Sequence, residues 1–491
     1  MRTLSAQRDG IIVPDLPTID TSTEQDVAGG GYNHWATAGF FGRLNYNYKE
    51  KYLLEVNGRY DGTSRFMKDQ RWNFFPSFSL GWNVARENFW KPLESVVNQF
   101  KLRGSWGELG NQNTSNLYPF YEILPVKSNS GNWLVNGGKT NTADIPSLVS
   151  TLLTWERVRS FNVGFDFGAF SNRLTGSFDY FVRKTVDMVG PAPQLPLVLG
   201  IAPAIVNNAD MKSYGFEIEL SWRDRIGEVD YGVKFNLADA QQKVVKYPNT
   251  TNAFSDWYAG KMSGEIWGYT SLGIAKTDEE MKEHLASLPN GGQNQLGNKW
   301  GAGDIMYADI NGDGKVDGGK GTLADPGDQR IIGNSTPRYN FGLVLDASYK
   351  GFDVSIFFQG VGKRDYAPIV GTNGAVFWGA VNNIWQSMAM EEHFDYFRPE
   401  GHPMGANLNG YYPRPDFTSN KNHQVQTRYL QDASYIRLKN LQIGYTLPKQ
   451  WINKLHINRC RVYVSGDNLW TGTSLASMFA VSYTHLTLPT N

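Results

Sequence analysis

The chain contains a single cysteine, no long apolar run and no excess of charge of either sign. One cysteine, Cys460, excludes an intrachain disulfide framework and a cysteine-rich zinc site. Lysine and arginine together number 47, as do aspartate and glutamate. This balance creates no global field that would attract nucleic acid, so we expect no nucleic-acid partner. No apolar stretch reaches the roughly eighteen residues that a transmembrane helix needs, so none is predicted.

Signals for enzymatic chemistry are also scarce. The histidines lack the spacing of a metalloprotease, the segment Gly138–Thr140 lacks the earlier glycine of a phosphate-binding loop, and no serine-nucleophile elbow occurs. We therefore predict that the protein is not an enzyme. What the sequence does have is 14% aromatic residues and 52 glycines, a combination that favours strands and turns over helices.

Apolar and polar residues alternate with a period of two along much of the chain, which is the pattern of β-strands. In the segment 161–167, for example, Phe161, Val163 and Phe165 fall on one face, and Asn162 and Asp166 fall on the other. The same rule predicts twelve strands, near residues 39–48, 52–60, 76–85, 99–106, 160–168, 173–183, 214–222, 230–238, 339–349, 352–360, 434–445 and 459–466.

Two architectures fit such strands: a soluble sandwich and a membrane β-barrel. The connections decide between them. Long segments at 107–159, 184–213, 239–338 and 361–434 alternate with short ones, as in an outer-membrane barrel with tight periplasmic turns and extended outer loops. We therefore predict an all-β, antiparallel transmembrane barrel. The first predicted strand runs inward and the last outward, so we expect about twelve strands from the middle and late part of a larger barrel.

Several blocks of the sequence carry a family resemblance. They are GRLNYNYKEKYLLEVNGRYDGTSRF at 42–66, FPSFSLGWNVARENFW at 75–90, LRGSWGELGNQ at 102–112, DMKSYGFEIELSW at 210–222, DINGDGKVD at 309–317 with DQRIIGNSTPRYNFGL at 328–343, YLQDASYIRLKNLQIGYTLPKQW at 429–451 and SGDNLW at 465–470. In this order they closely resemble the barrel half of SusC/RagA-like TonB-linked outer-membrane transporters.

The resemblance implies a 22-stranded barrel in the outer membrane, of which this chain would supply strands 10 to 21. It also implies an N-terminal plug region that engages TonB-ExbB-ExbD, a SusD-like surface lipoprotein that acts as a lid, and import of glycan oligosaccharides or peptides in Bacteroidota. Two alternatives stay open. One is a siderophore-type TonB receptor, which needs no lid, and the other is a soluble β-rich surface glycan-binding protein.

The resemblance divides the chain into three parts. We expect residues 1–30 to be an irregular start and residues 31–471 to be the partial barrel. Residues 472–491 depart from the family, because the segment FAVSYTHLTLPTN replaces the expected outer loop and closing strand. We interpret this tail as artefactual or non-native and assign it no function.

The segment 309–317 has the spacing of a calcium-binding loop. Gly314 stands at the sharp-turn position, Lys315 would offer its carbonyl, and hard oxygen ligands occupy the alternate positions. The twelfth position holds Lys320 instead of an acid, so Asp325 or Asp328 would have to substitute. A tight-turn role without metal is equally compatible. The expected ligands are Asp309, Asn311, Asp313, Lys315, Asp317 and Asp328, with Ca²⁺ in a structural role.

Aromatic residues in the predicted outer loops are candidates for stacking on sugars or gripping peptide side chains. For any one of them, packing within a loop or at the membrane interface is the favoured interpretation. The tryptophan candidates are Trp257, Trp267, Trp300, Trp378 and Trp385. Charged residues on the polar strand faces are expected to form a solvated wall network inside the barrel: Arg43, Glu55, Arg59, Glu217, Glu219, Lys234 and Arg437.

Overall fold

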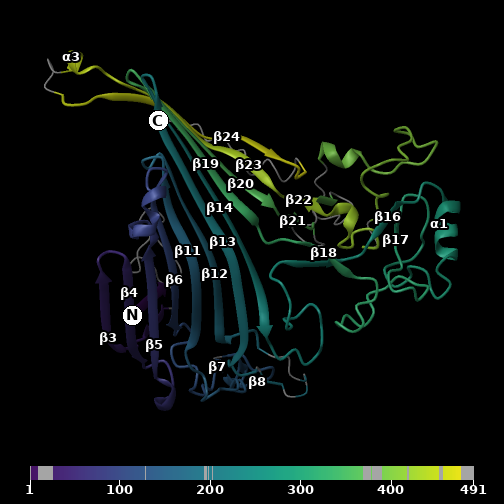
Figure 1. Ribbon diagram of the computed structural model, residues 1–491. Helices are drawn as coiled ribbons and strands as arrows, with labels where there is room; N and C mark the ends of the chain where they lie inside the picture. Colours follow the sequence, from purple (N-terminus) through teal and green to yellow (C-terminus); the bar gives the residue numbers. More distant parts are fainter. Residues whose placement is uncertain are drawn as a thin grey trace.

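The computed structural model describes residues 2–8, 26–114, 116–127, 129–192, 196, 198, 200–201, 203–368, 377–378, 390–416, 420–452 and 457–476, with backbone alone for 2–8 and 26–32. Their main feature is one curved antiparallel sheet of twelve strands (Figure 1). Each strand pairs with the next strand of the sheet in chain order. The strands β3 and β24 form the two edges of the sheet and do not pair with each other, so the sheet is open.

The strands of the sheet match the twelve predicted positions. They are β3 (Thr37–Tyr48), β4 (Tyr52–Thr63), β5 (Trp72–Asn83), β6 (Val97–Asn111), β11 (Glu156–Ala169), β12 (Leu174–Val189), β13 (Asn207–Ile226), β14 (Val229–Lys246), β19 (Arg338–Tyr349), β20 (Phe352–Lys363), β23 (Tyr435–Thr446) and β24 (Arg461–Thr473). All except β23 are longer than predicted, and β23 has the predicted length. The alternation of apolar and polar residues fades towards the strand ends, whereas the backbone ladder continues.

Tight turns close one end of the sheet. The strands β13 and β14 are joined by residues 227–228, and β19 and β20 by residues 350–351. Lys350 and Gly351 both have a positive φ, 46° and 89°, as a two-residue hairpin turn that follows the strand twist requires. The connections 84–96 and 447–460 at the same end contain the short helices η3 (Val84–Arg86), η4 (Asn88–Leu93) and α3 (Lys449–Ile452).

The opposite end carries the long connections, as predicted: 112–155, 190–206, 247–337 and 364–434 (Figure 1). The fifth connection there, 64–71, is short and includes η2 (Lys68–Gln70). Small two-stranded antiparallel pairs lie in three of the long connections, 112–155, 247–337 and 364–434. They are β7 (Val126–Lys127) with β10 (Thr142–Ala143), β8 (Leu134–Val135) with β9 (Gly138–Lys139), β15 (Glu265–Gly268) with β18 (Arg330–Asn334), β16 (Ser271–Ile274) with β17 (Ile305–Tyr307), and β21 (Asp365–Tyr366) with β22 (Gln431–Asp432).

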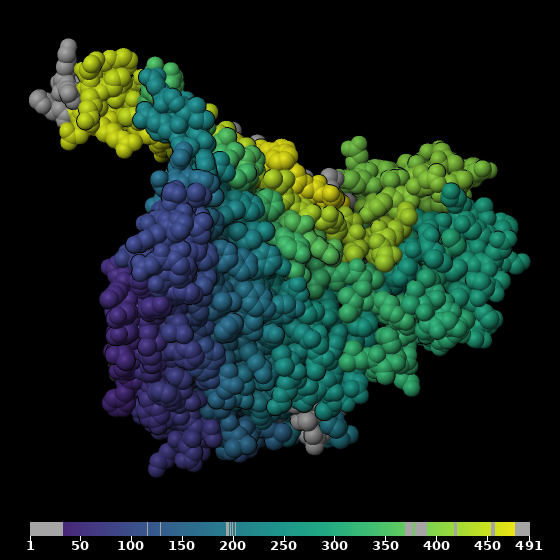
Figure 2. Space-filling model, in the orientation of Figure 1, coloured from purple at the N-terminus to yellow at the C-terminus, as the bar shows by residue number. Residues whose placement is uncertain are grey.

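The connections 247–337 and 364–434 pack together, and we call their described parts the outer lobe. The lobe stands off from the sheet, in teal to yellow-green in Figure 2. It contains α1 (Asp278–Ala286), η8 (Glu391–Phe394) and η9 (Thr427–Tyr429). Thr277 is the N-cap of helix α1, and its side chain accepts a hydrogen bond from the Glu280 amide. Residues from both connections form its aromatic core: Tyr269, Leu288, Ile305, Tyr307, Val316, Phe377, Trp378, Tyr412 and Tyr429.

The ends of the chain depart from expectation at one place. Residues 1–30 are not wholly irregular, because β1 (Arg2–Arg8) pairs with β2 (Asp26–Tyr32) in an antiparallel ladder. Most of the segment 472–491, interpreted above as a non-native tail, lies outside the described residues. Among the described residues, no helix combines the length and apolar character of a membrane span.

Candidate functional site

The sheet has one polar face, and its charged side chains are joined by ion pairs. Arg103 on β6 lies 2.8 Å from both Asp166 on β11 and Asp179 on β12, so one guanidinium links three strands. Arg43 lies 2.6 Å from Glu55, and Arg59 lies 3.0 Å from Asp61. These contacts confirm the predicted wall network for Arg43, Glu55 and Arg59.

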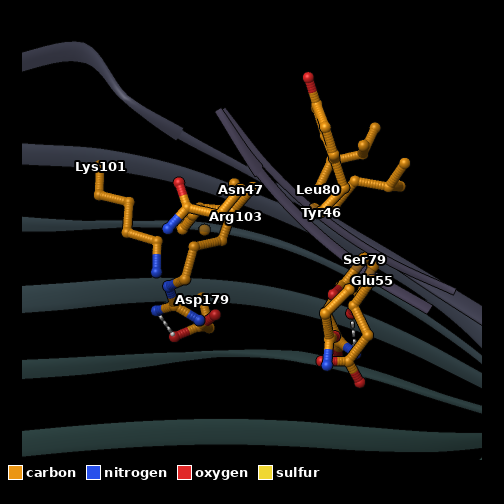
Figure 3. Close-up of a pocket in the computed structure, with 16 residues that line it drawn as sticks. Tyr46, Asn47, Glu55, Ser79, Leu80, Lys101, Arg103 and Asp179 are labelled. Carbon is orange, nitrogen blue, oxygen red and sulfur yellow. Dashed lines mark hydrogen bonds and ion pairs between the residues drawn. The ribbon is translucent and has the colours of Figure 1, made fainter. Parts of the chain in front are cut away.

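A shallow cavity of about 450 Å³ lies against this wall, beside the Arg103 ion pairs (Figure 3). Lys101, Arg103 and Asp179 lie on the polar side of the sheet, whereas Tyr46 and Leu80 extend away from it. Amide and hydroxyl groups supply much of the remaining polar lining: Asn45, Asn47, Ser79, Ser105 and Asn162. The wall therefore offers donors and acceptors to water or to a hydrophilic solute.

A second shallow cavity, of about 530 Å³, lies further along the same wall. Glu219 and Lys234, two of the predicted wall residues, line it together with Asn236 and Ser177. Arg437, on β23, donates to Thr471 on β24 at 3.1 Å. The polar face thus continues across the sheet.

The other face of the sheet is apolar and exposed. Phe161, Val163 and Tyr180 are each about two-fifths exposed or more, although they lie at the middle of long strands. Their neighbours in sequence point to the polar face, because side chains alternate along a strand. An exposed apolar surface of this extent is unusual for a water-soluble protein and is what lipid contact requires. Other exposed apolar residues are Phe40, Leu44, Tyr46, Val56, Tyr60, Phe74, Phe78, Leu80, Leu220, Ile443, Val462 and Val464.

The candidate tryptophans of the loops are engaged in packing. Trp378 is only 1% exposed and stacks on His423, with ring centroids 4.4 Å apart, so neither face is open to a ligand. Trp267 stacks on Phe254 at 4.6 Å, and Trp257 packs edge-on against Tyr247. These contacts fit the packing interpretation.

Trp300 is the fourth candidate, and it also packs within the outer lobe. Its ring lies edge-on to Tyr307, and the ammonium of Lys421 lies 5.0 Å from its centroid. Trp385 lies outside the described residues. A substrate role for any of these tryptophans stays a prediction.

The segment predicted to bind calcium forms a compact loop whose acids find partners within the protein. Both oxygens of Asp309 accept backbone hydrogen bonds, from Gly312 at 2.6 Å and from Gly314 at 2.8 Å. Asp313 accepts a hydrogen bond from the Lys315 amide. Asp317 is paired with the Lys315 ammonium at 2.6 Å and accepts from the Gly319 amide.

Asp328 closes the same loop from the far end. Its carboxylate is fully buried and accepts from the amides of Ile310 at 2.7 Å, Asn311 at 3.4 Å and Asp317 at 2.8 Å. Burial raises the pKa of this carboxyl, and the three amides act in the opposite direction. Asp325 instead lies in a neighbouring turn, where its backbone amide donates to the Thr322 hydroxyl at 3.1 Å.

The acids expected to bind calcium thus accept hydrogen bonds from the protein itself, and an internal ammonium pairs with one of them. Among the described residues, no group of three or more His, Cys, Asp or Glu side chains is arranged to hold a metal ion. That Lys315 offers its carbonyl to a cation stays a prediction, whereas its side chain forms an ion pair with Asp317. Calcium would have to displace that ammonium, and it remains a prediction for this loop.

Comparison with known proteins identifies the family. The family described as TonB dependent receptor-like, beta-barrel, matches residues 7–469. The chain belongs to this family. The family is one of outer-membrane receptors and not of enzymes, which confirms the predicted location and the prediction that the chain is not an enzyme.

Curated relatives of this TonB-dependent receptor barrel are themselves named TonB-dependent receptors. The chain is 30% identical over 451 residues to TonB-dependent receptor P3 of Formosa agariphila, a match that covers 88% of this chain and 41% of that protein. It is 25% identical over 427 residues to TonB-dependent receptor SusC of Bacteroides thetaiotaomicron, covering 84% and 38%. The chain therefore spans less than half the length of these relatives.

Solved structures show the same fold. The RagAB peptide transporter matches with a TM-score of 0.69 at 21% identity, over 94% of this chain and 46% of that one. The RagAB peptide importer in its 'closed-closed' state matches with a TM-score of 0.71 at 20% identity, over 95% and 48%. These similarities support the fold of a partial SusC/RagA-like barrel.

Proposed function

We propose that the chain forms part of the wall and outer loops of a TonB-dependent transporter that imports glycan oligosaccharides or peptides across the outer membrane. One observation carries the proposal: the family match runs across a sheet with a polar, ion-paired face and an exposed apolar face. In a barrel the polar face lines the interior and the apolar face meets lipid. Such a wall suits passage of a hydrophilic solute.

The remaining parts of the proposal concern the whole transporter. We propose that a plug region belonging to the full-length protein blocks the barrel, and that TonB-ExbB-ExbD supplies the energy to move it. A SusD-like lipoprotein would close the outer end. Similarity to SusC and to the RagAB peptide transporter supports this assignment. A siderophore-type receptor, the main alternative, would share the barrel and lack the lipoprotein.

Affinity purification and growth assays distinguish these possibilities. The full-length transporter, tagged and isolated from its native outer membrane, should bring down one lipoprotein in a fixed ratio. A deletion strain should fail to grow on a particular oligosaccharide or peptide, and the wild-type gene should restore growth. A growth defect confined to iron limitation, with no lipoprotein recovered, would reject the proposal in favour of a siderophore receptor.

A further inference from the structure

One buried carboxylate joins the two connections that make up the outer lobe. Asp304, in the connection 247–337, is fully buried. It accepts hydrogen bonds from Arg414 Nε at 2.8 Å and Nη2 at 2.6 Å, from Lys421 Nζ at 2.9 Å and from Asn422 Nδ2 at 2.9 Å. All three partners come from the other connection, 364–434. The amide of Gly301, which lies in the same connection as Asp304, also donates to the Asp304 carboxylate, at 2.9 Å.

The ammonium of Lys421 is buried as deeply as its partner. Lys421 is 1% exposed, and besides Asp304 it donates to the carbonyls of Asn298 at 3.2 Å and Lys299 at 3.0 Å. A buried charge is costly unless it is paired and hydrogen-bonded. Separating the two connections would leave Asp304 and Lys421 without these partners, so their association is strongly favoured.

Backbone and aromatic contacts extend the junction beyond the ion pairs. The Ile305 amide donates to Asn422 Oδ1 at 2.9 Å, and the Tyr307 hydroxyl donates to the Lys421 carbonyl at 2.7 Å. The Tyr269 amide donates to the Val425 carbonyl at 2.8 Å. The aromatic core described above is also drawn from both connections. Among the described residues, this core takes members from both connections, so neither connection forms it alone.

We propose that the outer lobe is a single cooperative body, in which the described parts of the connections 247–337 and 364–434 unfold and refold together. The buried carboxylate of Asp304 holds the two connections to each other, and we call it the latch. The ion pairs, the backbone contacts and the shared core all cross between the same two segments, which is the condition for one cooperative unit. A partner or solute at this side of the barrel would therefore meet one preformed surface and not two independent loops.

Hydrogen exchange of the full-length protein in detergent tests the proposal without any substrate. Amides that are exchange-protected in 305–307 and in 421–429 should open with the same free energy and lose protection at the same urea concentration. This measurement uses the wild-type protein, so it does not depend on how any variant folds. Two clearly different opening free energies for the two segments would overturn the proposal.

The latch itself is tested by Asp304→Asn, which keeps the shape and removes the charge. Exchange should become at least tenfold faster in both segments, because Arg414 and Lys421 lose their buried counter-ion. The double variant Asp304→Asn with Lys421→Met should recover part of the protection. Glu279→Gln, on the exposed side of helix α1, is the matched control and should leave both segments unchanged. Faster exchange confined to residues near 304 would contradict the latch.

Discussion

Lys315 holds its ammonium nitrogen 2.6 Å from Oδ2 of Asp317, inside the loop whose sequence has calcium-ligand spacing. The hydrogen bond from Lys315 keeps the pKa of the Asp317 carboxyl below its usual range. Because the folded pKa lies below the unfolded one, the contact stabilises the loop above about pH 4 and is lost as the pH falls through the folded value. The protein thus carries a cation of its own at this position.

Replacing Lys315 with Met should strengthen calcium binding by the loop at least tenfold, because it removes a positive charge and frees the Asp317 carboxylate. Calcium-dependent protection of the loop from proteolysis, measured on the full-length transporter, reports the change. Lys320→Met is the control. Asp313→Ala added to Lys315→Met should abolish the protection without affecting membrane insertion. If calcium protects neither the wild type nor Lys315→Met, the loop is a turn and not a metal site.

The outer lobe should loosen in mild acid because of His423. Burial lowers the pKa of this histidine to about 4, and Asp416 acts in the opposite direction. An unfolded histidine titrates near 6.5, so the folded lobe disfavours the proton and loses stability as the pH falls from about 6.5 to about 4. The loss is on the order of 3 kcal/mol.

Limited proteolysis of the lobe across this pH range provides the measurement. His423→Phe keeps an aromatic ring against Trp378 and removes the titrating group, so its protease resistance should depend less on pH. His402→Gln should retain the wild-type dependence. An unchanged pH dependence in His423→Phe would show that other groups govern the acid response.

The positions of the twelve strands could be predicted because lipid and the barrel interior impose opposite demands on neighbouring residues. Phe161 and Asn162 show this directly, since one is exposed on the apolar face and the other lines the polar cavity. The lengths of most strands could not be predicted. The pairing of β13 with β14 continues past Tyr214, which lies opposite Gln241. In that part of the two strands, polar residues no longer alternate with apolar ones.

The organisation of the outer lobe was beyond prediction for a different reason. Asp304 and Lys421 lie in irregular segments and are separated by 117 positions, so no periodicity connects them. The tryptophans were visible as residues, but whether a ring packs or binds depends on its neighbours. Trp378 is covered by His423 and by Tyr429, which come from a distant part of the connection 364–434.

The ion pairs on the polar face depend on Arg103, whose guanidinium pairs with the carboxylates of Asp166 and Asp179. Arg103→Met should lower the stability of the full-length barrel by about 1 kcal/mol, a modest amount because these side chains are partly exposed. Asp166 and Asp179 would then lose the guanidinium that they share. The temperature at which the barrel loses its compact, fast-migrating form on a gel should fall. Adding Asp179→Asn should restore part of the loss, and failure of this rescue would argue against the linked ion pairs.

The central claim is that this sheet is a barrel wall with one face in lipid, and two neighbouring substitutions test it most directly. Val163 is 44% exposed on the apolar face of β11, and Asn162 lines the polar cavity. In the full-length protein, Val163→Arg should destabilise the membrane-inserted barrel by about 2–4 kcal/mol. Asn162→Arg should insert and fold like the wild type. The fraction of folded protein recovered from outer membranes measures the effect of each substitution. Equal losses from the two substitutions, or a greater loss from Asn162→Arg, would contradict the account.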